Sequence, residues 1–194
     1  MGEERERPGA READLALVTV GDVELHDGPV ALAEYDPAWP DRYSMLGEQI
    51  RHALGGTALQ VEHVGSTSVP ELIAKPIIDI VLVVVDSARE EAYVPPLEAA
   101  GYALRIREPD WYEHRMLSGR SADVNLHVFS SGCPEIGRML RFRDRLRADP
   151  ADRGLYAAAK RELAARDWRH LQDYADSKTA VIDEIVARAS ARTG

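Results

Sequence analysis

The strongest hydrophobic signal in the chain is a nearly continuous apolar run at 76–85. Such a run is typical of a strand that is buried on both faces of a sheet. Shorter runs, several of them alternating with polar residues, predict further strands at 29–34, 57–64, 102–107, 112–117 and 122–129. We expect four to five of these segments to form one mixed sheet.

Helical spacing of apolar residues predicts two helices among these strands. Asp36 followed by Pro37 is a typical helix start, because the carboxylate accepts amide hydrogen bonds and proline fits the first turn. The apolar pattern then predicts a helix at 37–54, which Gly55 ends. A serine and a glutamate at capping-box spacing predict a second helix at 87–101.

The last third of the chain has a helical pattern throughout, with helices predicted at 134–147, 150–166 and 170–190. We therefore predict an α/β or α+β fold, in which flanking helices cover the sheet and the C-terminal third is all-helical. One domain is expected over 13–194, with its sheet core at about 29–130 and its helical part at about 134–190. Segment 13–20 fits either a short helix or a strand, and the charged residues 1–12 predict a mobile tail.

Composition restricts the classes of protein to which the chain could belong. A length of 194 residues suits one sizeable core. The net charge of -9 disfavours nucleic acid as a partner, because proteins held by phosphate contacts usually have a basic surface. The longest apolar run is interrupted by Asp79, so no membrane span is expected. A single cysteine, Cys133, and an N-terminus without signal-peptide character predict a reducing, cytoplasmic setting.

A short loop of glycine and hydroxyl residues, Gly65-Ser66-Thr67-Ser68, leaves the strand predicted at 57–64. Glycine allows the backbone to approach a ligand closely, and hydroxyls with successive amides can hold an anionic oxygen. We predict a phosphate-binding loop here, followed by a single helical turn at 71–74. The alternative is an ordinary turn with a serine cap.

Asp79 lies inside the most apolar strand, 13 residues after Ser66. An uncompensated carboxylate there would cost several kcal/mol, so Asp79 needs a metal ion, a cation or several hydrogen-bond donors. Asp123, Asn125 and His127 alternate on one face of a predicted strand. If that strand pairs with the Asp79 strand, this row would complete a cluster of ligands. The alternatives are a structural ion pair at Asp79 and a solvated row at 123–127.

Several cationic side chains are candidates for binding phosphate or neutralising charge. Lys75 and Arg115 lie near the predicted site in sequence, and Arg115 could bind phosphate through two hydrogen bonds. The segment 138–147 contains five arginines, of which Arg141 and Arg145, with Arg138, share one side of the predicted helix. A solvated helix face would explain the same arginines.

Five stretches of the sequence resemble the GrpB family, a branch of the nucleotidyltransferase superfamily, whose fold is similar to that of DNA polymerase β. The resemblance covers about residues 30 to 190, and its most specific part joins the Gly65–Ser68 loop to Asp79. The matching stretches are residues 33–40, 62–70 with 74–80, 125–128, 142–147, and Tyr156 with Lys160.

The resemblance implies a mechanism and assigns roles to residues. In the superfamily, a Gly-Ser loop holds the nucleotide's phosphates, two acids on the next strand bind divalent metal ions, and a third acid lies on a neighbouring strand. Gly65 and Ser66 match the loop and Asp79 matches the first acid, but Val81 stands where the second acid is expected. Asn125 and His127 lie on the third-acid strand, so Mg²⁺ would be held by Asp79, Asn125 and His127, with an oxygen from Glu62 or Asp123.

Three functions follow as hypotheses. The first is transfer of a nucleotidyl or phosphoryl group from an NTP to a small-molecule acceptor, with Asp79, Asn125, His127 and Lys75 as catalytic residues and Mg²⁺ as cofactor. The second is a noncatalytic nucleotide-binding or accessory module with a degenerate metal site. A third, RNA-directed nucleotide transfer, depends on the arginine-rich helix alone.

Overall fold

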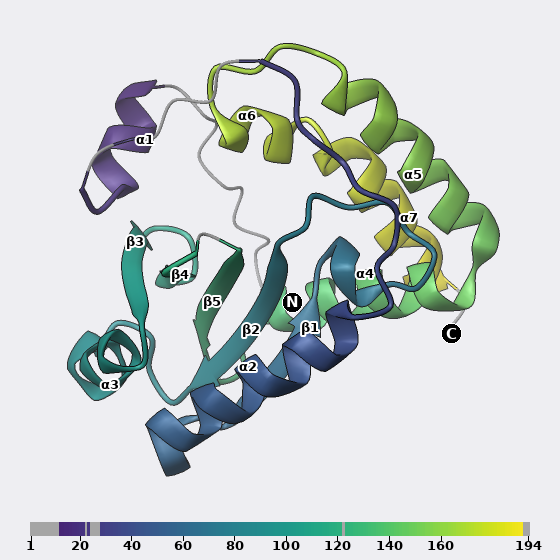
Figure 1. Ribbon diagram of the computed structural model, residues 1–194. Helices are drawn as coiled ribbons and strands as arrows, with labels where there is room; N and C mark the ends of the chain where they lie inside the picture. The colour runs from purple at the N-terminus through teal and green to yellow at the C-terminus, as the bar shows by residue number, and fades with distance from the viewer. Residues whose placement is uncertain (1–11, 22, 24–27, 122, 192–194) are drawn as a thin grey trace.

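The computed structural model describes residues 12–21, 23, 28–121 and 123–191. Its centre is a five-stranded sheet with the strand order β1-β2-β5-β4-β3 (Figure 1). The strands are β1 (Gln60–Val64), β2 (Ile78–Val84), β3 (Tyr102–Glu108), β4 (His114–Gly119) and β5 (Val124–Ser130). Strands β2 and β5 are parallel, whereas the other neighbouring pairs are antiparallel. The predicted mixed α/β sheet is therefore confirmed.

Helices flank the sheet on both sides (Figure 1). They are α1 (Glu12–Val18), α2 (Trp39–Leu54), α3 (Val94–Ala99), α4 (Pro134–Ala148), α5 (Pro150–Ala164), α6 (Leu171–Asp176) and α7 (Thr179–Ala191). The main hydrophobic core packs α2 and α3 against one face of the sheet. Helix α4 packs against the other face, and α5 and α7 pack beside it, so the predicted helical C-terminal third is confirmed.

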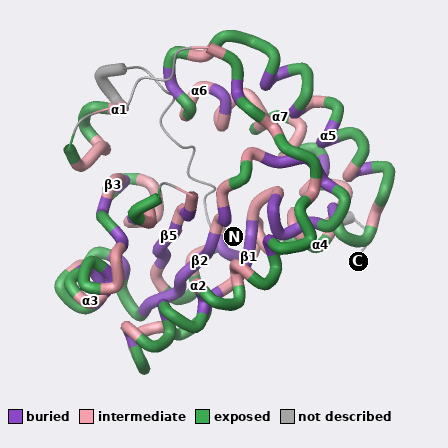
Figure 2. The backbone as a smooth tube through the Cα atoms, viewed as in Figure 1, coloured by how far each residue is buried: buried purple, intermediate pink, exposed green. Residues whose placement is uncertain are grey.

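Strand β2 is buried on both faces, as its apolar run predicts (Figure 2). Ile78, Ile80 and Leu82 point into the core below α2 and α3. Val81 and Val83 alternate with them and pack in a smaller cluster with residues of α4. Asp79 shares the face of these two valines, so it lies at the edge of an apolar cluster on the side of the C-terminal helices.

Two predicted elements are wrong. Residues 29–34 do not form a strand, because Ala33 makes only an isolated bridge with Ala74. The helix predicted at 87–101 shortens to α3, which begins after a 3-10 turn at Glu90–Ala92. Ser87 does not cap a helix, since its hydroxyl donates to the Glu113 carbonyl at 2.8 Å and contacts the Ser130 hydroxyl at 2.9 Å.

Smaller differences concern the ends of the chain. Segment 13–20, for which helix and strand were both open, is the helix α1 followed by a bridge from Thr19 to Ile106. The helix predicted at 170–190 is divided into α6 and α7. The tail predicted at 1–12 lies outside the described residues except for Glu12. No helix in the part of the chain that the structure describes is long and apolar enough to cross a membrane.

Candidate functional site

Asn125 and His127, two of the three polar side chains predicted to face Asp79, lie beside it. Its Oδ1 atom accepts a hydrogen bond from Asn125 Nδ2 at 3.0 Å and lies 3.7 Å from His127 Nε2. The parallel register pairs Asp79 directly with Asn125 and Val81 with His127. Because side chains alternate along a strand, Asn125 and His127 both share the face of Asp79. The structure thus brings these three residues together.

Gly65 passes close to the Asp79 carboxylate. Its φ of 68° lies in the region that favours glycine. A Cβ atom at this position would lie 2.3 Å from Asp79 Oδ2, far inside van der Waals contact. A 3-10 turn at Ser66–Ser68 follows, whereas the helical turn predicted at 71–74 is absent and Glu71 has a φ of 64°. The backbone at Gly65 can therefore approach Asp79 only because it carries no side chain.

The hydroxyls of the predicted phosphate loop have different surroundings. The Thr67 hydroxyl donates to the Ile77 carbonyl at 3.1 Å, and the Ser68 hydroxyl donates to the Gly65 carbonyl at 2.6 Å. Both side chains are buried, and these two hydrogen bonds fix the shape of the loop. Their role in binding phosphate stays a prediction. Ser66 is half-buried and forms a side-chain hydrogen bond with Tyr156 of α5.

Lysines from the helical part of the chain surround the same carboxylate. Lys178, between α6 and α7, has a pKa lowered to about 8 by burial, although the charge of Asp79 raises it in part and Lys75 lowers it further. Burial and the charge of Lys178 lower the pKa of Lys160 to about 7. Lys160 Nζ also donates to the Ile73 carbonyl at 2.7 Å. The site thus combines one carboxylate with three lysines.

The Asp79 carboxyl stays ionised despite its surroundings. Burial alone would raise its pKa, but the neighbouring His127, the hydrogen bond from Asn125 and the charge of Lys178 outweigh that effect. The pKa of Asp79 is therefore below its ordinary value. A negative charge in this position holds the amide of Asn125 and attracts the cations of the C-terminal helices.

The metal site that the resemblance implies is assembled only in part, because Asp79, Asn125 and His127 lie together but no second acid joins them. Val81 is fully buried among apolar side chains of β1, β2, β5 and α4. Glu62 is paired with Arg143 at 3.0 Å. Asp123 precedes the first residue of β5 and therefore does not follow the alternation of that strand. It pairs with Arg42 of α2, on the face of the sheet opposite Asp79. Among the described residues, no three His, Cys, Asp or Glu side chains are grouped so that they could hold a metal ion. The donor set does not fit a two-ion magnesium centre.

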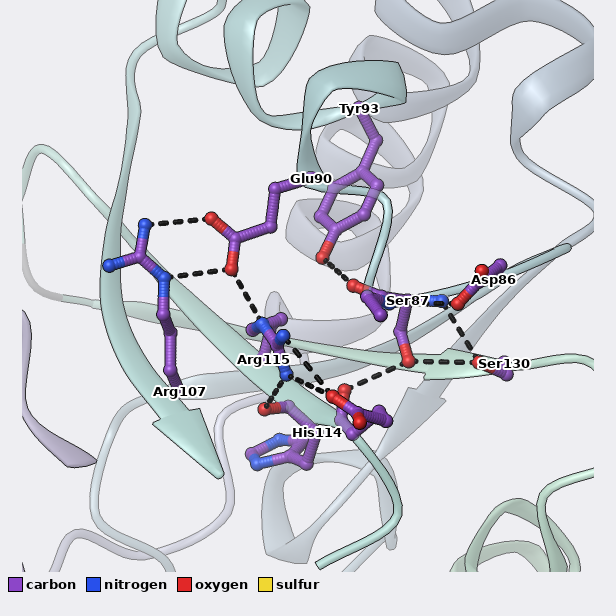
Figure 3. Close-up of polar contacts among 10 residues, drawn as sticks. Asp86, Ser87, Glu90, Tyr93, Arg107, His114, Arg115 and Ser130 are labelled. Carbon is purple, nitrogen blue, oxygen red and sulfur yellow. Dashed lines mark hydrogen bonds and ion pairs between the residues drawn. The ribbon is translucent and has the colours of Figure 1, made fainter. Parts of the chain in front are cut away.

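Arg115 lies on the opposite face of the sheet from Asp79, so its predicted role in binding phosphate there is wrong. It alternates with His114 and Met116 along β4, and Met116 is the residue that pairs with His127. Its guanidinium contacts Glu90 Oε1 at 2.6 Å and Glu113 Oε2 at 3.3 Å (Figure 3). The Arg115 side chain is buried, and its ion pair with Glu90 joins the turn that precedes α3 to β4.

The predicted arginines of α4 also point elsewhere. Arg145 pairs with Asp149 and Asp152, at 2.6 and 2.5 Å, and Arg141 is exposed to solvent. Two other arginines of the same helix contact the loop instead. Arg143 donates to the His63 carbonyl at 3.0 Å, and Arg147 donates to the Ser68 carbonyl at 2.9 Å. Arg143 and Arg147 of α4 therefore hold the end of β1 and the loop by donating hydrogen bonds to backbone carbonyls.

Sequence reasoning missed several residues of the site. His63 stacks on Tyr43 with ring centroids 4.6 Å apart, and its Nε2 atom contacts the Thr67 hydroxyl at 3.1 Å. Because that hydroxyl donates to Ile77, the histidine is the donor in this contact. Lys178 comes near Asp79 only because segments distant in sequence pack together. Tyr156 and Lys160 lie in one of the sequence stretches that resemble the GrpB family. That resemblance was the sequence signal for these two residues.

Comparison with known proteins identifies the family. The family model described as GrpB protein matches residues 29–188. The chain belongs to the GrpB family. It is 58% identical over 180 residues to the UPF0157 protein BH1888 of Halalkalibacterium halodurans, an alignment that covers 93% of this chain and 92% of that protein. The crystal structure of the conserved protein GrpB from Enterococcus faecalis is similar, with a TM-score of 0.70, 29% identity and coverage of 84% of this chain and 99% of that one.

A third relative is much longer than this GrpB chain. A dephospho-CoA kinase of Mycolicibacterium paratuberculosis is 34% identical over 192 residues. The alignment covers 86% of this chain but only 47% of the kinase. The GrpB-like part therefore occupies less than half of that protein.

Substituting Gly65 should disrupt the site and destabilise the fold. In Gly65→Ala the new methyl group meets the Asp79 carboxylate and the backbone keeps an unfavourable φ, so we expect a loss of about 1–3 kcal/mol in the free energy of unfolding. Urea denaturation measures this loss. Gly56→Ala is the matched control, because nothing lies within 4 Å of its added Cβ atom. Equal stability of the two variants would contradict the close approach described above.

His63 should make the protein sensitive to acid. Burial lowers its pKa in the folded state to about 4, although the charge of Asp79 raises it in part, whereas the unfolded value is near 6.5. Between these pH values the unfolded chain binds the extra proton, so stability falls as pH decreases, by roughly 3 kcal/mol in total. Urea unfolding at pH 7 and pH 4.5 should show a smaller loss for His63→Phe than for wild type. The exposed His52 provides the control: His52→Phe should behave like wild type.

Proposed function

We propose that this GrpB protein binds the phosphates of a nucleotide beside Asp79 and transfers a nucleotidyl or other phosphoryl-linked group from an NTP to a small-molecule acceptor. The observation that carries the proposal is the close approach of Gly65 to the Asp79 carboxylate, where an added Cβ atom would lie 2.3 Å from Oδ2. The charges of Lys160 and Lys178 act on this carboxylate, and the charge of Lys75 acts on Lys178. With one acid and three lysines, the site favours an anionic ligand.

The charge state of the lysines supports an anionic ligand. Burial lowers the pKa of Lys178 and Lys160, so an isolated ammonium group is less stable there than in water. A phosphate placed beside them would restore the charged form and neutralise it. Preorganised cations of this kind also stabilise the charge that develops on phosphate oxygens during transfer.

Similarity to other proteins supports the nucleotide class of ligand. Gly65, which matches the glycine of the superfamily's phosphate loop, lies against Asp79, and Ser66 follows it directly. The name of the longer relative from Mycolicibacterium paratuberculosis, dephospho-CoA kinase, denotes phosphoryl transfer. This chain has no Gly-x-x-x-x-Gly-Lys-Ser/Thr loop, so that kinase reaction itself is not proposed for it.

A noncatalytic nucleotide-binding module is the second candidate, and Val81 is the observation that favours it. The residue stands where the superfamily has its second acid, and it is buried among Val64, Val83 and Phe129. RNA-directed transfer has less support, since Arg138, Arg143 and Arg145 of α4 are paired with acidic residues.

Nucleotide binding should depend on Lys178. We expect Lys178→Met to weaken the binding of ATP at least tenfold, whereas Arg141→Met, on the exposed face of α4, should bind like wild type. Because burial lowers the pKa of free Lys178 to about 8 and bound phosphate would keep the lysine protonated, affinity should fall by up to about tenfold per pH unit above pH 8. Calorimetry at pH 7, 8 and 9 measures both effects. Equal affinity of wild type and Lys178→Met would contradict the proposed position of the phosphates.

Transfer should release pyrophosphate or another phosphate product. Each NTP is incubated with the protein and a metabolite pool, with and without Mg²⁺, and the product is measured enzymatically. We expect product from wild type and a loss of at least about 100-fold in Asp79→Asn, because the carboxylate orients the polar groups of the site. Nucleotide binding without any product would favour the noncatalytic module, and no binding at all would remove both candidates.

A further inference from the structure

Two of the three lysines of the site follow a tyrosine by four residues. Tyr156 precedes Lys160 in α5. Tyr174, in α6, precedes Lys178, which follows that helix. In a helical turn, side chains four residues apart lie close together on one side. The spacing therefore brings an aromatic ring close to each lysine whose charge acts on Asp79.

The ammonium groups of both lysines lie over the faces of these rings. Lys178 Nζ is 4.1 Å from the centroid of the Tyr174 ring. Lys160 Nζ is 5.4 Å from the centroid of the Tyr156 ring. Both distances fall within the roughly 6 Å over which a ring face attracts a cation. Because both tyrosines are buried, water screens this attraction little. We call each contact a tyrosine–lysine pair.

The two tyrosine–lysine pairs differ in what else holds the lysine. Lys160 Nζ donates to the Ile73 carbonyl at 2.7 Å. Among the described residues, the Lys178 ammonium has no hydrogen-bond partner, and the Tyr174 ring is its close contact. A ring face attracts the ammonium charge without taking up one particular N–H donor. The donors of Lys178 therefore remain available for an anionic ligand.

A ring face also leaves the charge of the lysine in place. A carboxylate paired with Lys178 would cancel its charge, whereas the neutral Tyr174 ring stabilises the ammonium and the net positive charge persists. The other charges that act on Lys178 are those of Asp79 and Asp176, which favour the ammonium form, and that of Lys75, which disfavours it. The ring therefore supports a cation at the site without adding another acid.

Packing fixes the Tyr174 ring itself. Trp168 lies against it at 65°, with ring centroids 6.0 Å apart, and Trp168 Nε1 donates to the Leu163 carbonyl at 2.8 Å. Val30, Leu163 and Ala164 belong to the same apolar cluster as Tyr174. The Tyr174 hydroxyl is buried and has no hydrogen-bond partner among the described residues. The ring, and not the hydroxyl, is the part of Tyr174 that makes specific contacts.

We propose that Tyr174 is a positioning residue that holds Lys178, through its ring face, in the place where the ammonium group binds phosphate. Tyr156 holds Lys160 in the same way and has a second role, because its hydroxyl forms a hydrogen bond with Ser66. This inference rests on the proposed function for its ligand, the phosphates of a nucleotide. The Tyr174 ring acts on this ligand through Lys178 alone.

ATP binding by the full chain, measured by calorimetry, separates the ring from the hydroxyl. Tyr174→Phe keeps the ring and removes a hydroxyl without a partner, so affinity should stay within about twofold of wild type. Tyr174→Leu removes the ring face, and we expect affinity to fall roughly fivefold. Tyr102→Leu is the matched control, because Tyr102 is equally buried and its hydroxyl also lacks a partner, but it lies in the core below α2 and α3. It should bind ATP like wild type.

A double-mutant cycle shows whether the ring acts through Lys178. If it does, adding Tyr174→Leu to Lys178→Met should weaken ATP binding no further, because the ring then has no cation to hold. A merely structural role of Tyr174 predicts the same loss, roughly fivefold, with and without Lys178. Equal losses in the two backgrounds would therefore overturn the proposal.

Fluorinated phenylalanines at position 174 provide the test if Tyr174→Leu does not fold. Fluorine withdraws electrons from the ring face and nearly keeps its shape, so ATP affinity should fall stepwise with each added fluorine. Affinity that stays constant or rises along this series, or a loss in Tyr174→Phe, would show that the ring face does not hold Lys178. If wild type binds no ATP, the proposed function and this role fall together. If wild type and Tyr174→Leu bind ATP equally, only the role of Tyr174 falls.

Discussion

The charge of Asp79, whose side chain is half-buried, is the interaction on which the arrangement of the site depends. A carboxylate in an otherwise apolar strand is stable only if donors and cations replace water. Asn125 supplies the donor from the parallel neighbouring strand, and Lys178 supplies charge from the helical part. Gly65 allows the preceding loop to lie against the same carboxylate. One acidic side chain therefore links the strand pairing, a glycine and helices that are distant in sequence.

The C-terminal helices are part of the site as well as its support. Lys160 holds the Ile73 carbonyl, Arg147 holds the Ser68 carbonyl, and Tyr156 contacts Ser66. Each contact fixes a backbone segment or side chain between β1 and β2. Because these partners come from α4 and α5, the conformation of the loop depends on packing of the helical part against the sheet. Without them, the Gly-Ser loop would be an ordinary turn.

The sequence predicted those features that follow from local pattern and strand parity. The buried strand, the helices after residue 134 and the row of Asn125 with His127 beside Asp79 are of this kind. The strand predicted at 29–34 was wrong because alternating apolar residues indicate burial only. An extended segment can be partly buried without pairing with a neighbouring strand. The side of Arg115 could not be known before the register of β4 with β5 was known. Glu108 and His114 meet only through the pairing of β3 with β4, which no local pattern specifies.

Val81 shows why the site has a different charge balance from the two-acid frame that it resembles. A second carboxylate at this position would lie among Val64, Val83, Phe129 and Ile136, where its desolvation would cost several kcal/mol. Lysines placed near a divalent ion would be destabilised, since like charges repel at short distance. Beside a single carboxylate they give the site an excess of positive charge. This charge supports the phosphate-bearing ligand that we propose.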